Sequence, residues 1–545
     1  MRASVMRFIT AQGVRSVGFL VAAGVAFAAC TSGDDDATGG KGGKGGGAPA
    51  SIVPPNWDRA VTKPADDAAQ SARESCTFKA GALAGETQGA SHPDGKDIPV
   101  DHVLIVMMEN RSFDHYFSKL PEYGQPDVEV FPATYTNRDS MMNDVAPFHG
   151  TDYCFVDTNH EWDGTHVSYA DGKMDGFFLA NDNHGGAPPH PKPDSLSGKR
   201  ALAYFDQTDI PFYYWLASEF SIADHYFCGL LGPTWPNRDY LYAASSRGAI
   251  TNTLVKFDDA KGYCSKELPC ANGAECVNQA CKGTCTKDED CGFEPPIGTC
   301  DVAGGGTCKP IGRTIFDYLE VRKIDWKVYA SGTPGFGLTL DAWLRYKDEH
   351  QKSIDDYYAD AAAGKLPQVA FIDPAIGAEG FGQNDEHPPS DMQFGQEFSA
   401  KIIDALMKSP NWSSSALFLT YDEHGGLFDH VPPPKACPPG DVPANVQPGD
   451  EPGEFDRYGV RVPMILVSPF AKKHFVAHGV YDHTSITRFV EARFNLPALT
   501  GRDANAAVPW EMFDFDTKPH LTPPAVTIPT IDQAKFDACK AVFGD

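Results

Sequence analysis

Beyond residue 30, the 545-residue chain has no apolar run long enough to cross a bilayer. It is also poor in positive charge: 46 lysines and arginines stand against 73 aspartates and glutamates, which gives a formal net charge of -27. Nucleic acid and anionic membrane surfaces would repel such a protein, so the composition argues against both as partners. No internal repeat is visible, and the hydrophobic content of 42% suffices for one large core or two ordinary domains.

Residues 1–29 have the pattern of a secretory signal peptide, because arginines precede the short apolar run VGFLVAAGVAFAA. The run ends in AFAAC, which resembles a bacterial lipobox, so we expect lipid attachment at Cys30, with ordinary cleavage as the alternative. The Gly-rich stretch that follows cannot bury apolar area, and residues 30–95 are predicted to be a flexible linker. The expected location is the bacterial cell envelope or the medium, with the lipid as the only membrane contact.

Cysteine is abundant, and the 14 cysteines suit an oxidising compartment. Residues 262–310 have almost no aliphatic core, which predicts an inserted disulfide-rich knot of unknown pairing. A zinc site is the alternative, but the spacing and the histidines of such a site are missing. The knot cysteines are Cys264, Cys270, Cys276, Cys281, Cys285, Cys291, Cys300 and Cys308. Apart from Cys30, the others form an odd set with one thiol left over: Cys76, Cys154, Cys228, Cys437 and Cys539.

Short apolar runs typical of buried parallel strands recur along the chain, at residues 102–108, 325–330, 368–373, 416–422 and 462–468. Helical spacing of apolar residues lies between them, for example at 211–227 and 394–409. The alternation predicts an α/β catalytic domain over residues 96–545, with a mostly parallel central sheet and helices on both faces. Ligands of such sheets collect at the carboxyl ends of the strands.

Two predicted strand ends carry oxygen ligands. Glu109 and Asn110 follow the run at 102–108. Asp422 and Glu423 follow the apolar part of the run at 416–422, and Gly425 and Gly426 after them allow a sharp turn. Four such donors suit one divalent cation, whose identity stays open among magnesium, calcium, manganese and zinc. The alternatives are a helix cap at the first corner and a solvated acidic loop at the second.

Thr234 precedes a helical run within TWPNR, at a predicted N-cap where an anion is favoured. A structural cap is the alternative. The form Thr-x-Pro-x-Arg, which ends at Arg238, resembles the Cys/Ser-x-Pro-x-Arg nucleophile motif of sulfatases. A threonine cannot form the sulfatase aldehyde, so an unmodified hydroxyl points to direct attack on phosphorus, as in alkaline-phosphatase-like enzymes.

Histidines in loop-like segments complete the candidate set. The stretch DTNHEWDGTH supplies His160 and His166, and NDEHPPSDMQF supplies His387 next to Glu386. Their imidazoles could hold phosphate oxygens or protonate a leaving alkoxide, although a surface role is the alternative. The candidate substrate-binding residues are Asn110, His160, His166, Arg238 and His387. Three further histidines are weaker candidates, with capping or packing as the alternative: His424, His430 and His483.

Together these segments, in this order over about residues 100–500, resemble the bacterial phosphoesterase family of phosphatidylcholine-hydrolysing phospholipase C and related acid phosphatases. The resemblance implies an alkaline-phosphatase-superfamily fold and one divalent metal ion. It implies Thr234 as a nucleophile that also touches the metal, and His160 and His387 as phosphate-contacting residues. The metal ligands that it implies are Glu109, Asn110, Thr234, Asp422 and Glu423.

We therefore expect a secreted, metal-dependent phosphoesterase, most simply of phospholipase C type, that acts through a covalent phosphothreonine at Thr234. His387 or His160 would protonate the leaving alcohol. The alternatives are an acid phosphatase acting on phosphomonoesters and a non-enzymatic surface binding or adhesion lipoprotein in which the disulfide knot is the active part. The expected partner is a phosphoester or phospholipid substrate, and the oligomeric state stays open.

Overall fold

The computed structural model describes residues 55–544, except 185–195, 253–274, 278–279, 283–297, 302–306, 311–313, 333–339 and 377–382. The predicted signal peptide and the lipidation site at Cys30 lie outside the described residues. In the described part of the chain, none of the helices is both long and apolar enough to cross a membrane.

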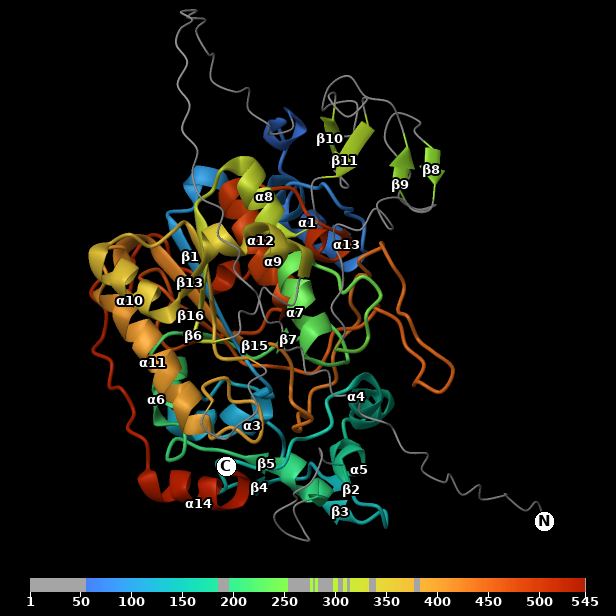
Figure 1. Ribbon diagram of the computed structural model, residues 1–545, viewed down its shortest axis with the longest axis vertical. Coiled ribbons are helices and arrows are strands. Elements are labelled where there is room, and N and C mark those ends of the chain that lie inside the picture. Colours follow the sequence, from blue (N-terminus) through green and yellow to red (C-terminus); the bar gives the residue numbers. More distant parts are fainter. Residues whose placement is uncertain are drawn as a thin grey trace, which may run out of the picture. The chain divides into compact units, whose positions relative to one another are not determined.

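An eight-stranded sheet lies at the centre of the domain, in the order β13-β12-β14-β1-β15-β16-β6-β17 (Figure 1). Neighbouring strands are parallel, except that β16 is antiparallel to both β15 and β6. The strands are β1 (His102–Met108), β6 (Ser221–Ala223), β12 (Trp326–Ala330), β13 (Gln351–Ser353), β14 (Val369–Asp373), β15 (Ser415–Tyr421), β16 (Met464–Val467) and β17 (Phe475–Ala477). The predicted mostly parallel α/β sheet is confirmed.

One of the five predicted parallel strands runs the other way. All five runs form strands of this sheet, but β16, predicted at 462–468, is antiparallel to its neighbours. Between β15 and β16 the chain passes through residues 422–463, which are all described and contain no helix. Without a helical crossover the chain returns from the edge where β15 ends, so the next strand must run antiparallel.

Helices cover both faces of the sheet, which explains why its strands are almost wholly apolar. On one face, Phe418 of β15 packs against Phe489 of α12, and on the other, Tyr421 contacts Tyr213 of α6. The first layer contains α7 (Thr234–Ala243), α8 (Ile315–Arg322) and α12 (His483–Phe494); the second contains α6 (Pro211–Glu219), α10 (Ile354–Ala363) and α11 (Met392–Lys408) (Figure 1).

Shorter elements make up the rest of the described chain. The other helices are α1 (Asp66–Glu74), α2 (Ala84–Thr87), α3 (Phe113–Phe117), α4 (Trp162–Tyr169), α5 (Phe177–Asn181), α9 (Leu340–His350), α13 (Gly501–Ala504) and α14 (Gln533–Phe543). Two-stranded sheets pair β2 (Asn137–Arg138) with β3 (Asp144–Val145), β4 (Phe148–His149) with β5 (Ala203–Tyr204), and β7 (Tyr226–Phe227) with β18 (Tyr481–Asp482).

The insert at 262–310 is described only as two backbone hairpins. They pair β8 (Glu275–Val277) with β9 (Ala280–Lys282), and β10 (Gly298–Asp301) with β11 (Thr307–Pro310). The side chains of its cysteines lie outside the described residues, so the disulfide-rich knot stays a prediction.

The helix predicted over 211–227 is wrong in its second half. Helix α6 ends at Glu219, and the chain then forms β6 and β7. Ile222 of β6 pairs with Ile465 of β16 and Val476 of β17, so sheet pairing on both sides outweighs the local helical spacing. The helix predicted at 394–409 is confirmed as α11.

The linker predicted over 30–95 ends too late. Trp57 is fully buried in the core, and α1 and α2 lie within the predicted linker. A disulfide joins Cys76 to Cys437, and the Gly81 amide donates to the carbonyl of Ala498 at 2.8 Å. These anchors come from distant parts of the chain, so the polar composition of the segment did not reveal them.

The expected odd cysteine is confirmed. Besides the Cys76–Cys437 bond, Cys154 is bonded to Cys539 on α14, and Cys228 is a buried free thiol. The Cys154–Cys539 disulfide joins the C-terminal helix α14 to the loop that leads to His160, so it restricts the movement of that loop.

Candidate active site

The two predicted ligand corners lie side by side because β1 and β15 are neighbours in the sheet. Met108 at the end of β1 is in register with Tyr421 at the end of β15. The pairs 109–110 and 422–423 therefore leave the sheet at the same edge, and the Asn110 amide donates to Asp422 Oδ1 at 3.2 Å. The convergence predicted from the strand ends is confirmed.

Both corners turn through left-handed backbone. Asn110 has a φ of 61°, and Gly425 and Gly426 have φ values of 65° and 70°. A Cβ on Gly425 would lie 2.6 Å from the Asn110 carbonyl oxygen, so only glycine lets the second corner approach the first.

Arg238 of α7 lies between the carboxylates, not at the surface. Its Nε donates to Asp422 Oδ2 at 3.1 Å, its Nη2 donates to Glu109 Oε1 at 3.3 Å, and its Nη1 lies 3.8 Å from Asp373 Oδ1. The side chain is fully buried. Its other described bonds go to carbonyls of β1, while Nη1 has no hydrogen-bond partner among the described residues. The structure thus makes Arg238 the counter-charge of the carboxylates, and the substrate contact predicted from the sequence stays a prediction.

Thr234 is the first residue of α7, one position later than predicted, because Pro233 is the N-cap. It precedes Arg238 by one helical turn, so both side chains lie on the same face of α7. Since Arg238 bonds Asp422 and Glu109, that face is turned toward the two corners. The hydroxyl therefore lies in the first turn of α7, at the positive end of the helix, on the face that is turned toward the acidic cluster.

The residues at the two corners are of the kind that binds a divalent cation, although Glu109, Asp422 and Glu423 are not among the described groups of three whose ligand atoms lie within 4.8 Å of one another. Among the described residues, the buried Asn110 Oδ1 and Nδ2 and Glu423 Oε1 have no hydrogen-bond partner. Buried polar atoms without partners are costly and rare in native proteins, and here they occur in a set of hard oxygen donors. The candidate ligands are Glu109, Asn110, Thr234, Asp422 and Glu423.

Burial dominates the charge state of these carboxyls. It raises the pKa of Glu109 to about 7 and that of Asp422 to about 8, although Arg238 lowers both. Glu423 differs from them. Burial alone would raise its pKa, but the charge of His160 outweighs burial and the pKa lies below the ordinary value. Without a cation, the cluster thus holds protons that a cation would displace.

His160 and His387 meet beside this cluster. Their rings are 5.5 Å apart, and His160 Nε2 lies 4.0 Å from Glu423 Oε1. Each Nδ1 donates to a backbone carbonyl, of Thr158 and Pro388, both at 2.7 Å, which leaves Nε2 for a ligand. Burial alone would lower the pKa of His160, but Glu423 and nearby carboxylates raise it to about 10.

The remaining candidate histidines have other contacts. His166 Nδ1 donates to the Trp162 carbonyl at 2.7 Å and its ring packs on Trp162, and none of its described contacts reaches the cluster. His430 pairs with Asp114 at 2.6 Å. His483 Nε2 donates to the Asp422 carbonyl at 2.6 Å, which is a supporting contact and agrees with the packing alternative.

His424 is buried, and neither ring nitrogen has a hydrogen-bond partner among the described residues, although Nδ1 lies 3.3 Å from Glu423 Oε2.

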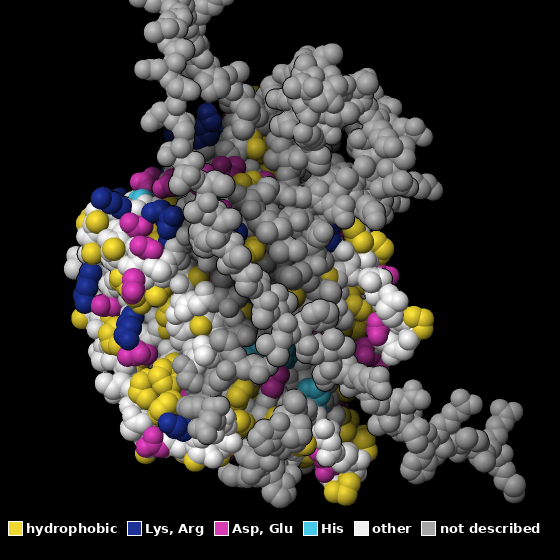
Figure 2. All heavy atoms as spheres, in the orientation of Figure 1, with side chains coloured by type: hydrophobic (Ala, Val, Ile, Leu, Met, Phe, Trp, Pro, Cys, Tyr) yellow, Lys and Arg dark blue, Asp and Glu magenta, His cyan; other side chains and the backbone are white. Residues whose placement is uncertain are grey.

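Two carboxylates near the site were missed from the sequence. Asp157 lies close enough to His160 and His387 for the three to hold one metal ion between them. Asp385 accepts the amide of Glu109 at its carbonyl, at 3.0 Å, and the amide of His387 at Oδ1, at 3.1 Å. In the sequence, the only local indication that Asp385 belongs to the site is its position two residues before His387. On the face shown in Figure 2, histidine and acidic side chains come to the surface close together, where Figure 1 places α4 and the end of β15.

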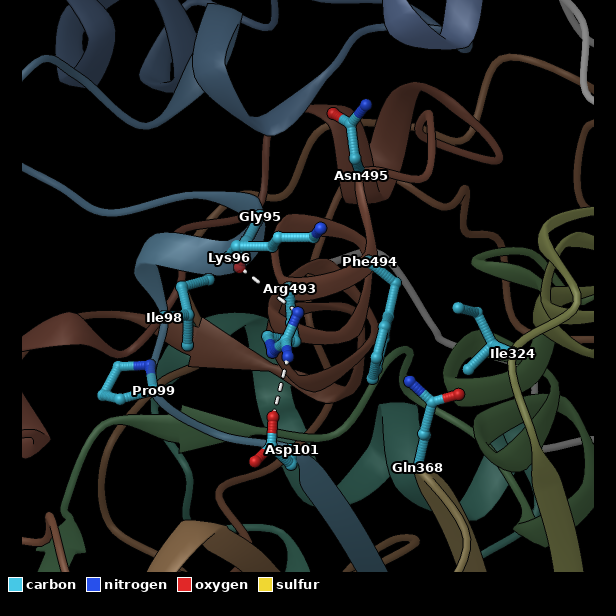
Figure 3. A pocket seen from close by; sticks show the side chains of 10 residues that line it. All are labelled: Gly95, Lys96, Ile98, Pro99, Asp101, Ile324, Gln368, Arg493, Phe494 and Asn495. Atoms are coloured by element: carbon cyan, nitrogen blue, oxygen red, sulfur yellow. Dashed lines mark hydrogen bonds and ion pairs between the residues drawn. The ribbon is translucent and has the colours of Figure 1, made fainter.

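A hollow lies at the edge of the sheet opposite to the two ligand corners (Figure 3). Its walls include Lys96, which precedes β1, and Gln368, which precedes β14, so it faces the amino ends of the strands. Arg493 spans it and donates to the Gly95 carbonyl at 3.4 Å and to Asp101 Oδ1 at 3.1 Å. Arg493 is thus already paired with protein groups. The edge at which ligands of this fold collect is the opposite one, where the parallel strands have their carboxyl ends.

Cation binding should tighten as the pH rises from about 6 to about 8, because protons on Glu109 and Asp422 compete with the cation. We expect up to ~10-fold in affinity per pH unit for each proton displaced. Calorimetric titration of the metal-free chain with Mn²⁺, in two buffers of different ionisation enthalpy, measures both affinity and proton release. Asp422→Asn should release fewer protons, and a pH-independent affinity in the wild type would contradict the expectation.

The chain is similar to known proteins over most of its length. The model of the phosphoesterase family matches residues 100–497. Non-specific phospholipase C1 of Arabidopsis thaliana is 29% identical over 444 residues, which cover 77% of this chain and 72% of that protein. Phospholipase C A of Mycobacterium tuberculosis is 27% identical over 486 residues, 81% of this chain and 82% of that protein.

Non-hemolytic phospholipase C of Burkholderia pseudomallei is 32% identical over 429 residues, 73% of this chain but 55% of that protein. A solved protein of the alkaline phosphatase superfamily from Vibrio parahaemolyticus aligns over 78% of this chain and 93% of its own, with 10% identity and a TM-score of 0.29. That score is too low to carry an argument, and the fold rests on the sheet itself. The family match spans most of the catalytic domain, so the chain belongs to the phosphoesterase family and is a hydrolase of phosphoric esters.

Proposed function

We propose that the chain is a phospholipase C-type enzyme that cleaves the phosphodiester of a phospholipid through Thr234. The observation that carries the proposal is the position of Thr234, at the start of α7 and one turn before the arginine that bonds Asp422 and Glu109. A hydroxyl in the first turn of a helix, on the face that carries this arginine, supports attack on phosphorus beside a set of oxygen ligands.

In the first step, Thr234 Oγ1 gives up its proton and attacks phosphorus while the bond from phosphorus to the leaving alkoxide breaks, and the alkoxide takes up one proton, so that none is gained or lost overall. In the second step, water attacks the phosphothreonine, the bond from Oγ1 to phosphorus breaks, and one proton of the water goes to Oγ1. A diester thus yields an alcohol and a phosphate monoester, and a monoester would yield inorganic phosphate. When bound, a divalent cation would supply positive charge to the phosphoryl oxygens and to the Thr234 oxygen.

His160 and His387 supply the proton in this proposal. Their Nδ1 atoms are held by backbone carbonyls, so both Nε2 atoms are fixed in direction, that of His160 at 4.0 Å from Glu423 Oε1, and can donate to a phosphate oxygen or to the departing alkoxide. Arg238 stays with the carboxylates and does not bind the substrate. Asn110, whose side-chain amide has no hydrogen-bond partner in the described part of the chain, is the neutral donor or ligand of the set.

The phospholipase C names of the relatives support a diester substrate. A phosphatase acting on monoesters uses the same groups and is the second candidate, because Thr234 and the two histidines do not themselves distinguish the esters.

Hydrolysis of matched chromogenic substrates tests the proposal. With Mn²⁺, Mg²⁺, Ca²⁺ or Zn²⁺ added to the metal-free chain, we expect turnover of p-nitrophenyl phosphorylcholine and release of phosphocholine from phosphatidylcholine vesicles. Turnover of p-nitrophenyl phosphate alone would replace the phospholipase by a phosphomonoesterase. Inactivity on every ester with every metal would reject the proposed chemistry.

A further inference from the structure

Glu386 lies next to the candidate acid His387 but points into the protein, where it is fully buried. Its carboxylate accepts three tyrosine hydroxyls: Tyr116 at 2.6 Å and Tyr421 at 2.9 Å bond Oε2, and Tyr213 at 2.6 Å bonds Oε1. All three tyrosines are buried as well. We refer to Glu386, Arg111 and these tyrosines as the Glu386 cluster.

The Glu386 cluster reaches both ligand corners through the chain. Tyr421 is the residue before Asp422, at the end of β15. Tyr116 accepts a hydrogen bond from Arg111 Nε at 3.1 Å, and Arg111 directly follows Asn110 and donates to its carbonyl at 3.0 Å. Arg111 also donates to the Glu386 carbonyl. The Glu386 carboxylate is thus connected to the neighbour of each ligand pair, by one hydrogen bond to Tyr421 and by two hydrogen bonds to Arg111.

Residues 385–387 form a third corner of the site, and the backbone of Glu386 determines its position. Its φ of 75° is in the left-handed region, which a side chain other than glycine adopts only when its surroundings hold it there. On one side, the Asp385 carbonyl accepts the Glu109 amide, and on the other, the His387 amide donates to Asp385 Oδ1. Gly395 of α11 makes room, since a Cβ there would lie 2.1 Å from Glu386 Cγ.

We propose that Glu386 is the positioning residue of this site: its tyrosine-bound carboxylate holds the corners at 109–110, 422–423 and 385–387 in fixed relative positions. Its catalytic consequence rests on the proposed function, while its effect on cation affinity does not. Glu386 itself touches neither substrate nor the reacting atoms. A buried carboxylate costs desolvation, and apolar side chains of similar volume would stabilise the core as well, so fixing the corners is what the carboxylate adds.

The test compares Glu386→Gln and Tyr213→Phe with Tyr214→Phe as the matched control. Tyr214 is the next residue of α6 and equally buried, but its hydroxyl bonds the Phe205 carbonyl at 3.2 Å and is outside the cluster. Glutamine keeps the shape of Glu386 but removes its negative charge and puts an NH₂ group among hydroxyl donors, so a hydroxyl that faces this group must turn to accept from it or lose its bond.

Three measurements apply to each purified variant: the melting temperature, the affinity of the metal-free chain for Mn²⁺ by calorimetry, and kcat on p-nitrophenyl phosphorylcholine. We expect Glu386→Gln to weaken Mn²⁺ binding ~10–100-fold, as loss of a residue that orients ligands does. It should lower kcat ~100-fold, because small displacements of reacting groups have effects of that size. Tyr213→Phe should have smaller effects of the same kind, and Tyr214→Phe should change neither affinity nor kcat.

A merely structural Glu386 predicts a different result. Glu386→Gln would then lower the melting temperature while the folded variant kept wild-type Mn²⁺ affinity and kcat, and this outcome overturns the inference. If Glu386→Gln does not fold, the comparison of Tyr213→Phe with Tyr214→Phe decides in the same way. A wild-type chain that hydrolyses no phosphoester, but loses Mn²⁺ affinity on Glu386→Gln, rejects the proposed function and keeps the inference.

Discussion

Replacing Thr234 with alanine should lower kcat on p-nitrophenyl phosphorylcholine by at least ~10⁴-fold, which corresponds to about 5 kcal/mol of lost transition-state stabilisation. The variant keeps the oxygen ligands, Arg238 and both histidines, so substrate should still bind, but no protein oxygen can form the bond to phosphorus. Thr234→Ser restores a hydroxyl at the same helix position and should recover activity to within ~100-fold of the wild type. Acid quenching during turnover, followed by peptide mass spectrometry, should place a phosphate on Thr234 in the wild type only.

Thr487→Ala is the matched control for loss of a buried hydroxyl. Thr487 of α12 donates to the Leu241 carbonyl of α7 at 2.6 Å, so the change alters the support of the same helix without touching its first turn. Its effect should be on stability, with kcat close to wild type. An active Thr234→Ala would mean that water attacks the ester directly and that no phosphothreonine forms.

The sequence predicted the site where its signal was local. The apolar runs 102–108 and 416–422 match β1 and β15 to within a residue, because a strand buried on both faces needs continuous apolar residues. Once two such strands are neighbours and parallel, the residues that follow them must lie at one edge. The convergence of Glu109 with Asp422 therefore followed from the pattern of apolar residues.

Long-range pairing was not predictable in this way. Arg238 bonds a carboxylate 184 positions away, and Glu386 bonds a tyrosine hydroxyl 173 positions away. No spacing in the sequence marks either partner, and the motif around Arg238 favoured a contact with substrate. The segment that contains Trp57 has the local composition of a linker, and its anchor is equally distant: Cys76 in this segment is bonded to Cys437, 361 positions away.

Strand β6 shows a different failure. Its three residues continue the helical spacing of α6, and only pairing with β16 and β17 selects the strand. Short central strands carry too few residues for their own periodicity, so their structure is decided by neighbours that the local sequence does not reveal.

Arg238 has two possible roles, as a substrate-binding residue and as the counter-charge of the buried carboxylates, and the two roles predict opposite results for Arg238→Gln. As the counter-charge of Glu109 and Asp422, Arg238 is needed most when no cation is present. Removing one partner of a buried ion pair leaves uncompensated charge, so the metal-free variant should lose about 3–5 kcal/mol in its free energy of unfolding. Urea unfolding of the metal-free wild type and variant measures this loss.

The loss should also depend on pH. In the folded chain Glu109 and Asp422 have pKa values of about 7 and about 8, while the unfolded chain releases these protons at about pH 4. The free energy of unfolding therefore falls as the pH rises from about 4 to about 8. Without Arg238 those pKa values rise further, and the destabilisation should be larger at about pH 8 than at about pH 6.

A divalent cation should reverse part of this loss, because it supplies positive charge to the same carboxylates and stabilises the folded chain by its binding free energy. Arg488→Gln is the matched control: Arg488 is equally buried and pairs with Glu491 at 2.8 Å on α12, so its loss of stability should not respond to the cation. If Arg238→Gln instead keeps its stability and raises KM for the ester, Arg238 contacts the substrate. A metal-dependent rescue that is present for Arg238→Gln and absent for Arg488→Gln would identify the carboxylates that Arg238 holds as the cation ligands.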